Sequence, residues 1–226
     1  MRRAGGEENF RGIWLLLLGF CAAAAAVLIL CLTAKNRLPD IVDRRLTAAE
    51  EAEVIGRNSP LIDYIYLSPN ADFPRGEAIS RLTIHHMADN LGLEDLGAAF
   101  AQRDRQASAN YAIDSGGEVA LYVEEANRAW TSSSRENDHR AVTIEVANDE
   151  IGGDWHVSGE AYEKLLELCT DICRRNGIEE LRYTGGTDGN LTLHKMFSSE
   201  TECPGPYLES RMGEIAVEVT RRLREP

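Results

Sequence analysis

A long apolar segment near the N-terminus limits how this chain can be built. Residues 12–34 run for 23 positions without a charged side chain. As a helix, this segment would be about 34 Å long, which is enough to cross a hydrocarbon core of about 30 Å. We therefore predict a transmembrane anchor over residues 12–34, preceded by a short N-terminal tail, residues 1–11.

A cleaved signal peptide is the alternative to an anchor, and it would give a secreted form of the protein. The apolar region of a signal peptide is shorter, about 7–15 residues, and is followed by a cleavage site with small residues at its first and third positions. The only candidate here is Leu32-Thr33-Ala34, whose first residue is large. The sequence therefore favours the uncleaved anchor.

Basic residues lie on both sides of the apolar segment, with Arg2, Arg3 and Arg11 before it and Lys35 and Arg37 after it. The excess of Lys and Arg that marks the cytoplasmic side therefore does not decide the orientation. Export of the large C-terminal part is the simpler arrangement. We expect a single-pass protein of the cell membrane with its folded domain on the extracytoplasmic side.

The charge of the chain argues against a role in nucleic-acid binding. The formal net charge is −13, and residues 1–37 contain five basic and two acidic residues, so the remainder carries −16. Affinity for nucleic acids comes largely from Lys and Arg side chains that neutralise phosphates. We expect no nucleic-acid partner.

A polar segment separates the predicted anchor from a compact domain. Residues 35–60 are densely charged, with a short helical signal at Thr47–Arg57, and we predict that they form a stalk. The patterning of a compact domain begins at Leu61, so we place the domain at residues 61–226. That length suffices for one hydrophobic core and one domain, which we expect to act as a monomer.

Strand-like and helix-like patterns alternate along the predicted domain. In Arg81–His86 apolar and polar side chains alternate with a period of two, as they do in Ala141–Ala147. This period is typical of β-strands. The sequence predicts further strands at Glu118–Val123 and Leu181–Thr184, and helices at Leu93–Gln102, between Ser158 and Gly177, and at Glu209–Arg224. Such alternation predicts an α/β domain around a mostly buried sheet.

The five cysteines do not suggest a disulfide framework, because their number is odd and their spacing irregular. Cys21 and Cys31 lie in the apolar segment. Cys169 and Cys173 fall on the apolar stripe of the helix after Ser158, so we expect them to be packing residues.

Three side chains could together hold a zinc ion. His85 lies at the end of a predicted strand, and His194 and Cys203 lie nine positions apart in a loop rich in Gly and Pro. Zinc binds imidazole and thiolate readily, and three protein ligands leave a fourth position for water, as in catalytic zinc sites. Glu145, on the polar face of its strand, could take a proton from that water. From the residues alone, ordinary core and surface roles for these side chains stay open.

Three blocks of sequence carry a resemblance to a known family. RLTIHHMAD at 81–89, AVTIEVAND at 141–149 and LHKMFSSETECPGP at 193–206 resemble, in order and spacing, the zinc-dependent N-acetylmuramoyl-L-alanine amidases of the type-2 family. That family shares its fold with the peptidoglycan-recognition proteins. The resemblance covers residues 62–224.

The resemblance implies a fold and a site. The fold would be a single mixed central sheet flanked by helices, and His85, His194 and Cys203 would be the ligands of Zn²⁺. Glu145 would be the catalytic glutamate. The substrate would be peptidoglycan, cleaved at the amide bond between N-acetylmuramic acid and L-alanine.

The chain departs from the family pattern next to Cys203. Many members carry a lysine two residues before the cysteine, where it steadies the oxyanion, whereas this chain has Thr201. A threonine can donate a hydrogen bond but brings no charge, so we expect Thr201 to act in catalysis with a weaker electrostatic contribution unless Lys195 supplies the charge. The spacing of nine between His194 and Cys203 also looks one residue longer than in the family.

Several other residues have two interpretations. His86 could exchange the ligand role with its neighbour His85. We expect His139 and His156 at the surface. Trp130 and Tyr111 either line a substrate groove or pack in the core.

Two other classes of function stay open. One is a non-catalytic, membrane-tethered peptidoglycan-binding module, against which the complete ligand set and Glu145 argue. The other is a cysteine hydrolase that uses Cys203 with His194. Reactive thiolates usually lie at a helix N-terminus or beside a cation, whereas Cys203 is followed by Pro-Gly-Pro.

Overall fold

A computed structural model describes residues 46–225 of the chain. The predicted tail, the predicted anchor at 12–34 and the first part of the predicted stalk lie outside these residues. Among residues 46–225, no helix combines the length and the apolar character that crossing a membrane requires.

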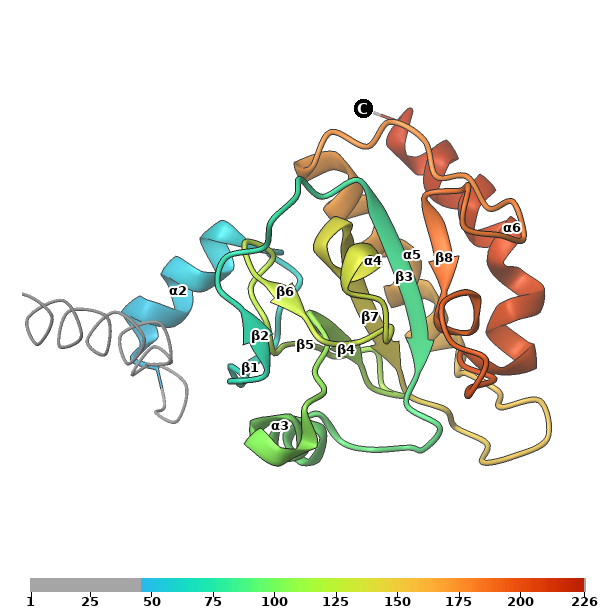
Figure 1. The fold of residues 1–226 in the computed structure, drawn as a ribbon. Coiled ribbons are helices and arrows are strands. Elements are labelled where there is room, and N and C mark those ends of the chain that lie inside the picture. Colours follow the sequence, from blue (N-terminus) through green and yellow to red (C-terminus); the bar gives the residue numbers. More distant parts are fainter. Residues whose placement is uncertain (1–45, 226) are drawn as a thin grey trace, which may run out of the picture. The chain divides into compact units, whose positions relative to one another are not determined.

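A six-stranded mixed sheet forms the centre of the domain (Figure 1), as the resemblance implied. Its strand order is β1-β5-β4-β7-β3-β8, and every neighbouring pair is parallel except β4 and β5. The strands are β1 (Tyr64–Ile65), β3 (Arg81–His86), β4 (Tyr111–Ile113), β5 (Val119–Leu121), β7 (Ala141–Val146) and β8 (Leu191–Leu193). A separate two-stranded sheet pairs β2 (Ala71–Asp72) with β6 (Arg128–Ala129).

One face of the central sheet is apolar and packs against two long helices. The apolar side chains of β3 and β7 on this face include Leu82, Ile84, Val142 and Ile144, and all four are fully buried. They pack in one cluster with the apolar stripes of α5 (Gly159–Arg175) and α6 (Gly205–Leu223). Period-two strands and period-3.6 helices thus bury one continuous core.

The other face is polar along its centre and is covered by shorter elements. Thr83 of β3 and Thr143 of β7 are in register. The Asn137 side chain of α4 (Arg135–Arg140) donates a hydrogen bond of 2.9 Å to the Thr83 hydroxyl. Two residues further along the same face come His85 and Glu145, also in register. Helix α3 (Leu93–Ala101) covers the neighbouring strands β4 and β5 through a small apolar cluster.

Most of the predicted elements are confirmed. Strands β3, β5 and β7 and helix α3 lie where the patterns placed them. Helix α5 begins after Ser158, whose hydroxyl accepts the Ala161 N–H as an N-cap, and Gly177 beyond its end has φ +68°. Helix α6 begins at Gly205, four residues earlier than predicted.

The predicted strand at Leu181–Thr184 is wrong. This segment forms no strand, because the side chains of Thr220 and Asn190 accept the N–H groups of Leu181 and Arg182 at 3.0 and 2.6 Å. The edge strand is instead β8, Leu191–Leu193, which pairs with β3.

The described part of the predicted stalk belongs to the folded body. Helix α2 (Ala48–Arg57) opens with a capping box formed by Thr47 and Glu50. Its Val54 is buried in the main core, and the side-chain oxygen of Asn58 accepts the Glu125 N–H at 2.8 Å. The domain thus begins before Leu61, the residue at which the change in composition had placed its start.

Candidate metal centre and active site

The three predicted metal ligands come from separate elements and meet at one point. His85 is the fifth residue of β3, and His194 follows β8 directly, in a 3₁₀ helix. Because Leu193 of β8 is in register with Ile84 of β3, the two histidines lie side by side, with ring centroids 4.8 Å apart. Cys203 lies two residues before α6, and its Sγ is 3.5 Å from His85 Nδ1. One ligand atom from each residue lies within 4.8 Å of the others.

The chemistry of these donors fits zinc. His85 is 1% exposed, and burial lowers its pKa well below the ordinary value, with smaller contributions from His194 and His86. Its imidazole is therefore neutral and has a lone pair to donate. Two imidazoles and one cysteine sulfur, bound as the thiolate, are ligand types that catalytic zinc sites use, and three protein ligands leave one position open.

Cys203 is poorly suited to act as a nucleophile by itself. The structure places it two residues before helix α6, although the Pro-Gly-Pro that follows it argued against a helix N-terminus there. Burial nevertheless raises the pKa of its thiol well above the ordinary value, and the nearby Glu145 adds to the rise. The main-chain N–H of His86, 3.4 Å from Sγ, lowers the pKa of the thiol, but by less than burial raises it. Without a metal the sulfur is a protonated thiol, which weakens the cysteine-hydrolase hypothesis.

Glu145 lies beside the three ligands, where the sequence placed it. The register of β3 and β7 pairs it with His85, and its Oε1 is 3.9 Å from His85 Nδ1. The side chain is 15% exposed, and Oε2 is buried without a hydrogen-bond partner among residues 46–225. Burial raises the pKa of this carboxyl to about 8, against a smaller opposing effect of Arg105. This value applies without a metal, and a bound cation beside the carboxyl would favour its ionised form, in which the unused oxygen can act as a general base.

The two residues proposed to steady the oxyanion have different surroundings. The Thr201 hydroxyl accepts the main-chain N–H of Cys203 at 3.1 Å, so it lies in the turn that carries the ligand and keeps its own proton to donate. Lys195 instead donates to Glu202 at 2.8 Å and to Glu209 at 3.1 Å. Two carboxylates thus already neutralise its charge, which argues against Lys195 as the source of positive charge.

Arg105 is a cation near the site that sequence reasoning missed. It follows α3 in a short 3₁₀ helix and is exposed, with its guanidinium 5.7 Å from the centre of the Phe100 ring. Phe100 packs in one cluster with Ala112, and Ala112 is in register with Glu145. The charge of Arg105 acts through space on the Glu145 carboxyl and lowers its pKa slightly. No sequence signal distinguishes it from the other basic residues of that loop.

The remaining histidines lie outside the ligand set. The His86 ring packs edge-on against Trp155 at 5.2 Å, so the exchange of roles with His85 is not supported. His156 is partly exposed, as expected, and its Nδ1 lies 2.6 Å from Asp149. His139 is more enclosed than expected, at 16% exposure, and its Nδ1 accepts the Gly76 N–H at 2.8 Å.

The structure decides the role of one of the two aromatic residues and gives the surroundings of the other. Tyr111 is fully buried and donates to Glu125 at 2.6 Å, so it is a core residue and does not line a groove. Trp130 is half-buried, and its indole N–H donates to Asp72 at 2.9 Å. Cys169 and Cys173 are buried on α5, as predicted.

Comparisons with known proteins give the family of the sequence and relatives of the fold. The family model for N-acetylmuramoyl-L-alanine amidase matches residues 75–206. A crystal structure of an AmpD derivative is similar with a TM-score of 0.52 and 20% identity over 71% of this chain and 93% of that one. The structure of PlyL is similar with a TM-score of 0.51 and 16% identity, over 74% of this chain and 91% of that one. A mutant endolysin from Bacillus subtilis is similar with a TM-score of 0.51 and 14% identity, over 70% of this chain and 99% of that one. A search of curated proteins finds no match.

Proposed function

Because the chain belongs to the N-acetylmuramoyl-L-alanine amidase family, we propose that it hydrolyses the amide bond between N-acetylmuramic acid and L-alanine in peptidoglycan. The observation that carries this proposal is the meeting of His85, His194 and Cys203 beside the buried carboxyl of Glu145. A zinc ion held by these three side chains would polarise the amide carbonyl and bring the pKa of a water molecule down to about 7.

Glu145 would then move the proton in both halves of the reaction. Its free Oε2 accepts a proton from the attacking water and passes it to the departing nitrogen of L-alanine. The carbonyl carbon loses its bond to nitrogen and gains one to the water oxygen, so no covalent bond to the protein is needed. His85 and His194 remain neutral donors throughout.

The developing negative charge on the amide oxygen needs a partner of its own. The Thr201 hydroxyl is a hydrogen-bond donor next to Cys203. Arg105 is the nearby cation without a carboxylate partner among the described residues, since Lys195 is paired. We therefore assign to Arg105 the charge that the family lysine supplies at the position of Thr201.

Replacing Arg105 with glutamine is expected to lower kcat/KM on peptidoglycan roughly tenfold, less than the 10²–10³ typical of a buried oxyanion donor, because Arg105 is exposed and screened by salt. Zinc affinity should not change. Arg103→Gln removes the same charge two residues earlier and serves as the control. Equal losses in the two variants, or none in Arg105→Gln, would show that Arg105 has no special role.

The bond that is cut can be identified directly. Purified peptidoglycan is incubated with the full-length protein in detergent, and the soluble products are analysed by mass spectrometry. We expect intact stem peptides with a free N-terminal L-alanine and no new reducing sugar ends. His85→Ala should abolish release, whereas His156→Ala, which alters a histidine outside the site, should leave it intact. Binding to peptidoglycan without any release would instead identify a non-catalytic binding module.

We also propose that residues 12–34 tether the domain to the cell membrane on its extracytoplasmic side, where the wall polymer lies. The support is the length and apolar character of that segment. Extraction of the full-length protein from membranes by detergent, but not by alkaline carbonate, would agree with an anchor. Recovery of a shortened protein in the medium would contradict it.

A further inference from the structure

The loop between β6 and α4 brings a serine against one of the proposed metal ligands. The hydroxyl oxygen of Ser133 lies 3.5 Å from Nε2 of His194. Sixty-one positions separate the two residues in sequence, so this contact belongs to the fold and not to local chain geometry. The contact involves a ring nitrogen, which is where the orientation and tautomer of a ligating histidine are decided.

Ser133 has a backbone conformation that residues with a Cβ rarely adopt. Its φ is +60°, in the left-handed region that glycine occupies freely. A glycine here would relieve the strain but would carry no hydroxyl. Strained residues of this kind gather at functional sites, where the surrounding structure imposes the conformation.

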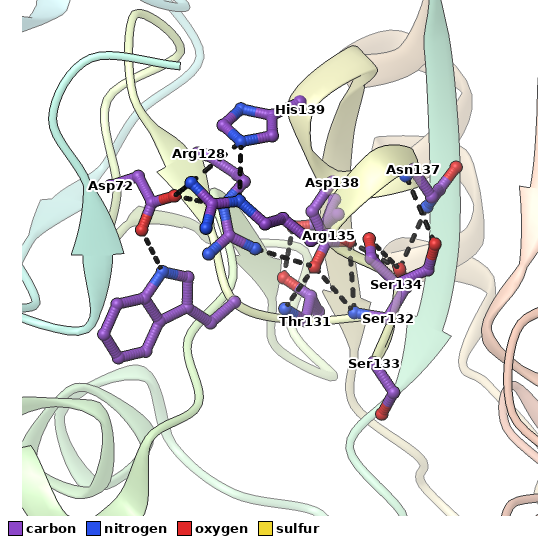
Figure 2. A network of polar contacts seen from close by, with 12 residues as sticks. Asp72, Arg128, Thr131, Ser132, Ser133, Ser134, Arg135, Asn137, Asp138 and His139 are labelled. Atoms are coloured by element: carbon purple, nitrogen blue, oxygen red, sulfur yellow. Dashed lines mark hydrogen bonds and ion pairs between the residues drawn. The ribbon is translucent and has the colours of Figure 1, made fainter. Parts of the chain in front are cut away.

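A buried network imposes this conformation from the residues beside Ser133 (Figure 2). The Asp138 carboxylate accepts the N–H groups of Thr131 and Ser132, each at 3.1 Å, and the Ser132 hydroxyl at 2.5 Å. On the other side, the Ser134 hydroxyl accepts the Asn137 N–H and caps α4. Ser133 is thus held between two fixed neighbours, and Figure 2 shows its side chain pointing away from the network.

We propose that Ser133 is a positioning residue for His194: its hydroxyl oxygen accepts the Nε2–H of the ring and so leaves the lone pair of Nδ1 for the metal. A neutral imidazole has one N–H and one lone pair, so fixing the proton on Nε2 fixes the ligand atom. Partners of this kind also fix the orientation of a ligating ring. The inference rests on the proposed metal site, in which His194 is a ligand.

Two variants separate this role from a purely structural one. Ser133→Ala removes the hydroxyl and keeps the strained backbone, whereas Ser133→Gly removes both. We expect each variant of the full-length protein to bind zinc about tenfold more weakly than the wild type in competition with a chelating dye, in line with the 10–100-fold losses seen for such partners. Ser133→Gly should have the higher melting temperature of the two in the metal-free state, by about 2 °C or more.

Cobalt provides a readout that does not depend on activity. In Co²⁺-loaded protein, the visible absorption bands should shift in both variants, because the His194 ring is no longer held in one orientation. Wild-type zinc affinity and an unchanged cobalt spectrum in both variants would overturn the inference. A wild-type protein that binds no zinc would instead overturn the proposed function, so the two failures are distinguishable.

Discussion

Replacing Glu145 with glutamine is expected to lower kcat on peptidoglycan by roughly 10²–10⁴-fold, the range that a positioned general base contributes. The amide has nearly the shape of the carboxyl but cannot accept the proton of the attacking water. Zinc should still bind, because Glu145 is not one of the three ligands. Release of L-alanine amino termini, measured at saturating substrate, tests the loss. Glu150→Gln alters an exposed residue of the following loop and should be fully active.

The same substitution should stabilise the metal-free protein. Burial raises the pKa of Glu145 to about 8, from 4.5, so the folded protein holds a proton that the unfolded chain releases. Between these two pH values the free energy of unfolding therefore falls as pH rises. At pH 8, chelated Glu145→Gln should be more stable than the wild type by on the order of 2–4 kcal/mol, and near pH 4 this advantage should vanish.

Urea denaturation of the metal-free wild type and the metal-free Glu145→Gln variant, at pH 8 and near pH 4, measures this difference. A variant that keeps its turnover would remove Glu145 from the mechanism. A stability difference that is the same at both pH values would show that the carboxyl does not carry the raised pKa that burial implies.

The largest effect on stability is expected from Glu125. Its side chain is 6% exposed and accepts hydrogen bonds from the Tyr111 hydroxyl at 2.6 Å, from Arg175 at 2.7 and 3.0 Å and from Asn176 at 2.9 Å. Its main-chain N–H also binds Asn58, after helix α2. Glu125→Ala leaves the buried Tyr111 hydroxyl without its acceptor and removes one of the two carboxylates that pair with Arg175, the other being Asp171. We expect it to lower the free energy of unfolding by roughly 3–5 kcal/mol.

The neighbouring residue provides the control for this prediction. Glu124 pairs with Arg57, whose side chain is 50% exposed. Such a pair contributes about 0–1 kcal/mol, so Glu124→Ala should change the stability little. Urea denaturation of the two variants side by side tests the difference. Losses of similar size would mean that the Glu125 network is no stronger than a surface ion pair.

The parts of the fold that were predictable are those with local signals. The period-two alternation of β3 and β7 predicts which side chains share a face within each strand, whereas the family resemblance placed His85 and Glu145 in one site. The caps of α5 are local as well, since Ser158 and Gly177 each act within one turn of the helix.

The parts that were missed depend on partners distant in sequence. Strand β8 has only three residues, and its pairing with β3 defines it, whereas the more strand-like Leu181–Thr184 forms no strand because two of its N–H groups donate to distant side chains. The left-handed conformation of Ser133 is imposed by Asp138, and serine itself has no preference for it. The relevance of Arg105 arises only because α3 folds over the strand next to Glu145.

The central claim is that three side chains hold one metal ion with which Glu145 acts. The most direct test is to strip the full-length protein with a chelator, dialyse it, and titrate it with zinc while measuring bound metal and L-alanine release together. We predict no release from the stripped protein, and release that rises in proportion to bound zinc up to one ion per chain. Release that persists without bound metal, or full zinc occupancy without release, would contradict the account.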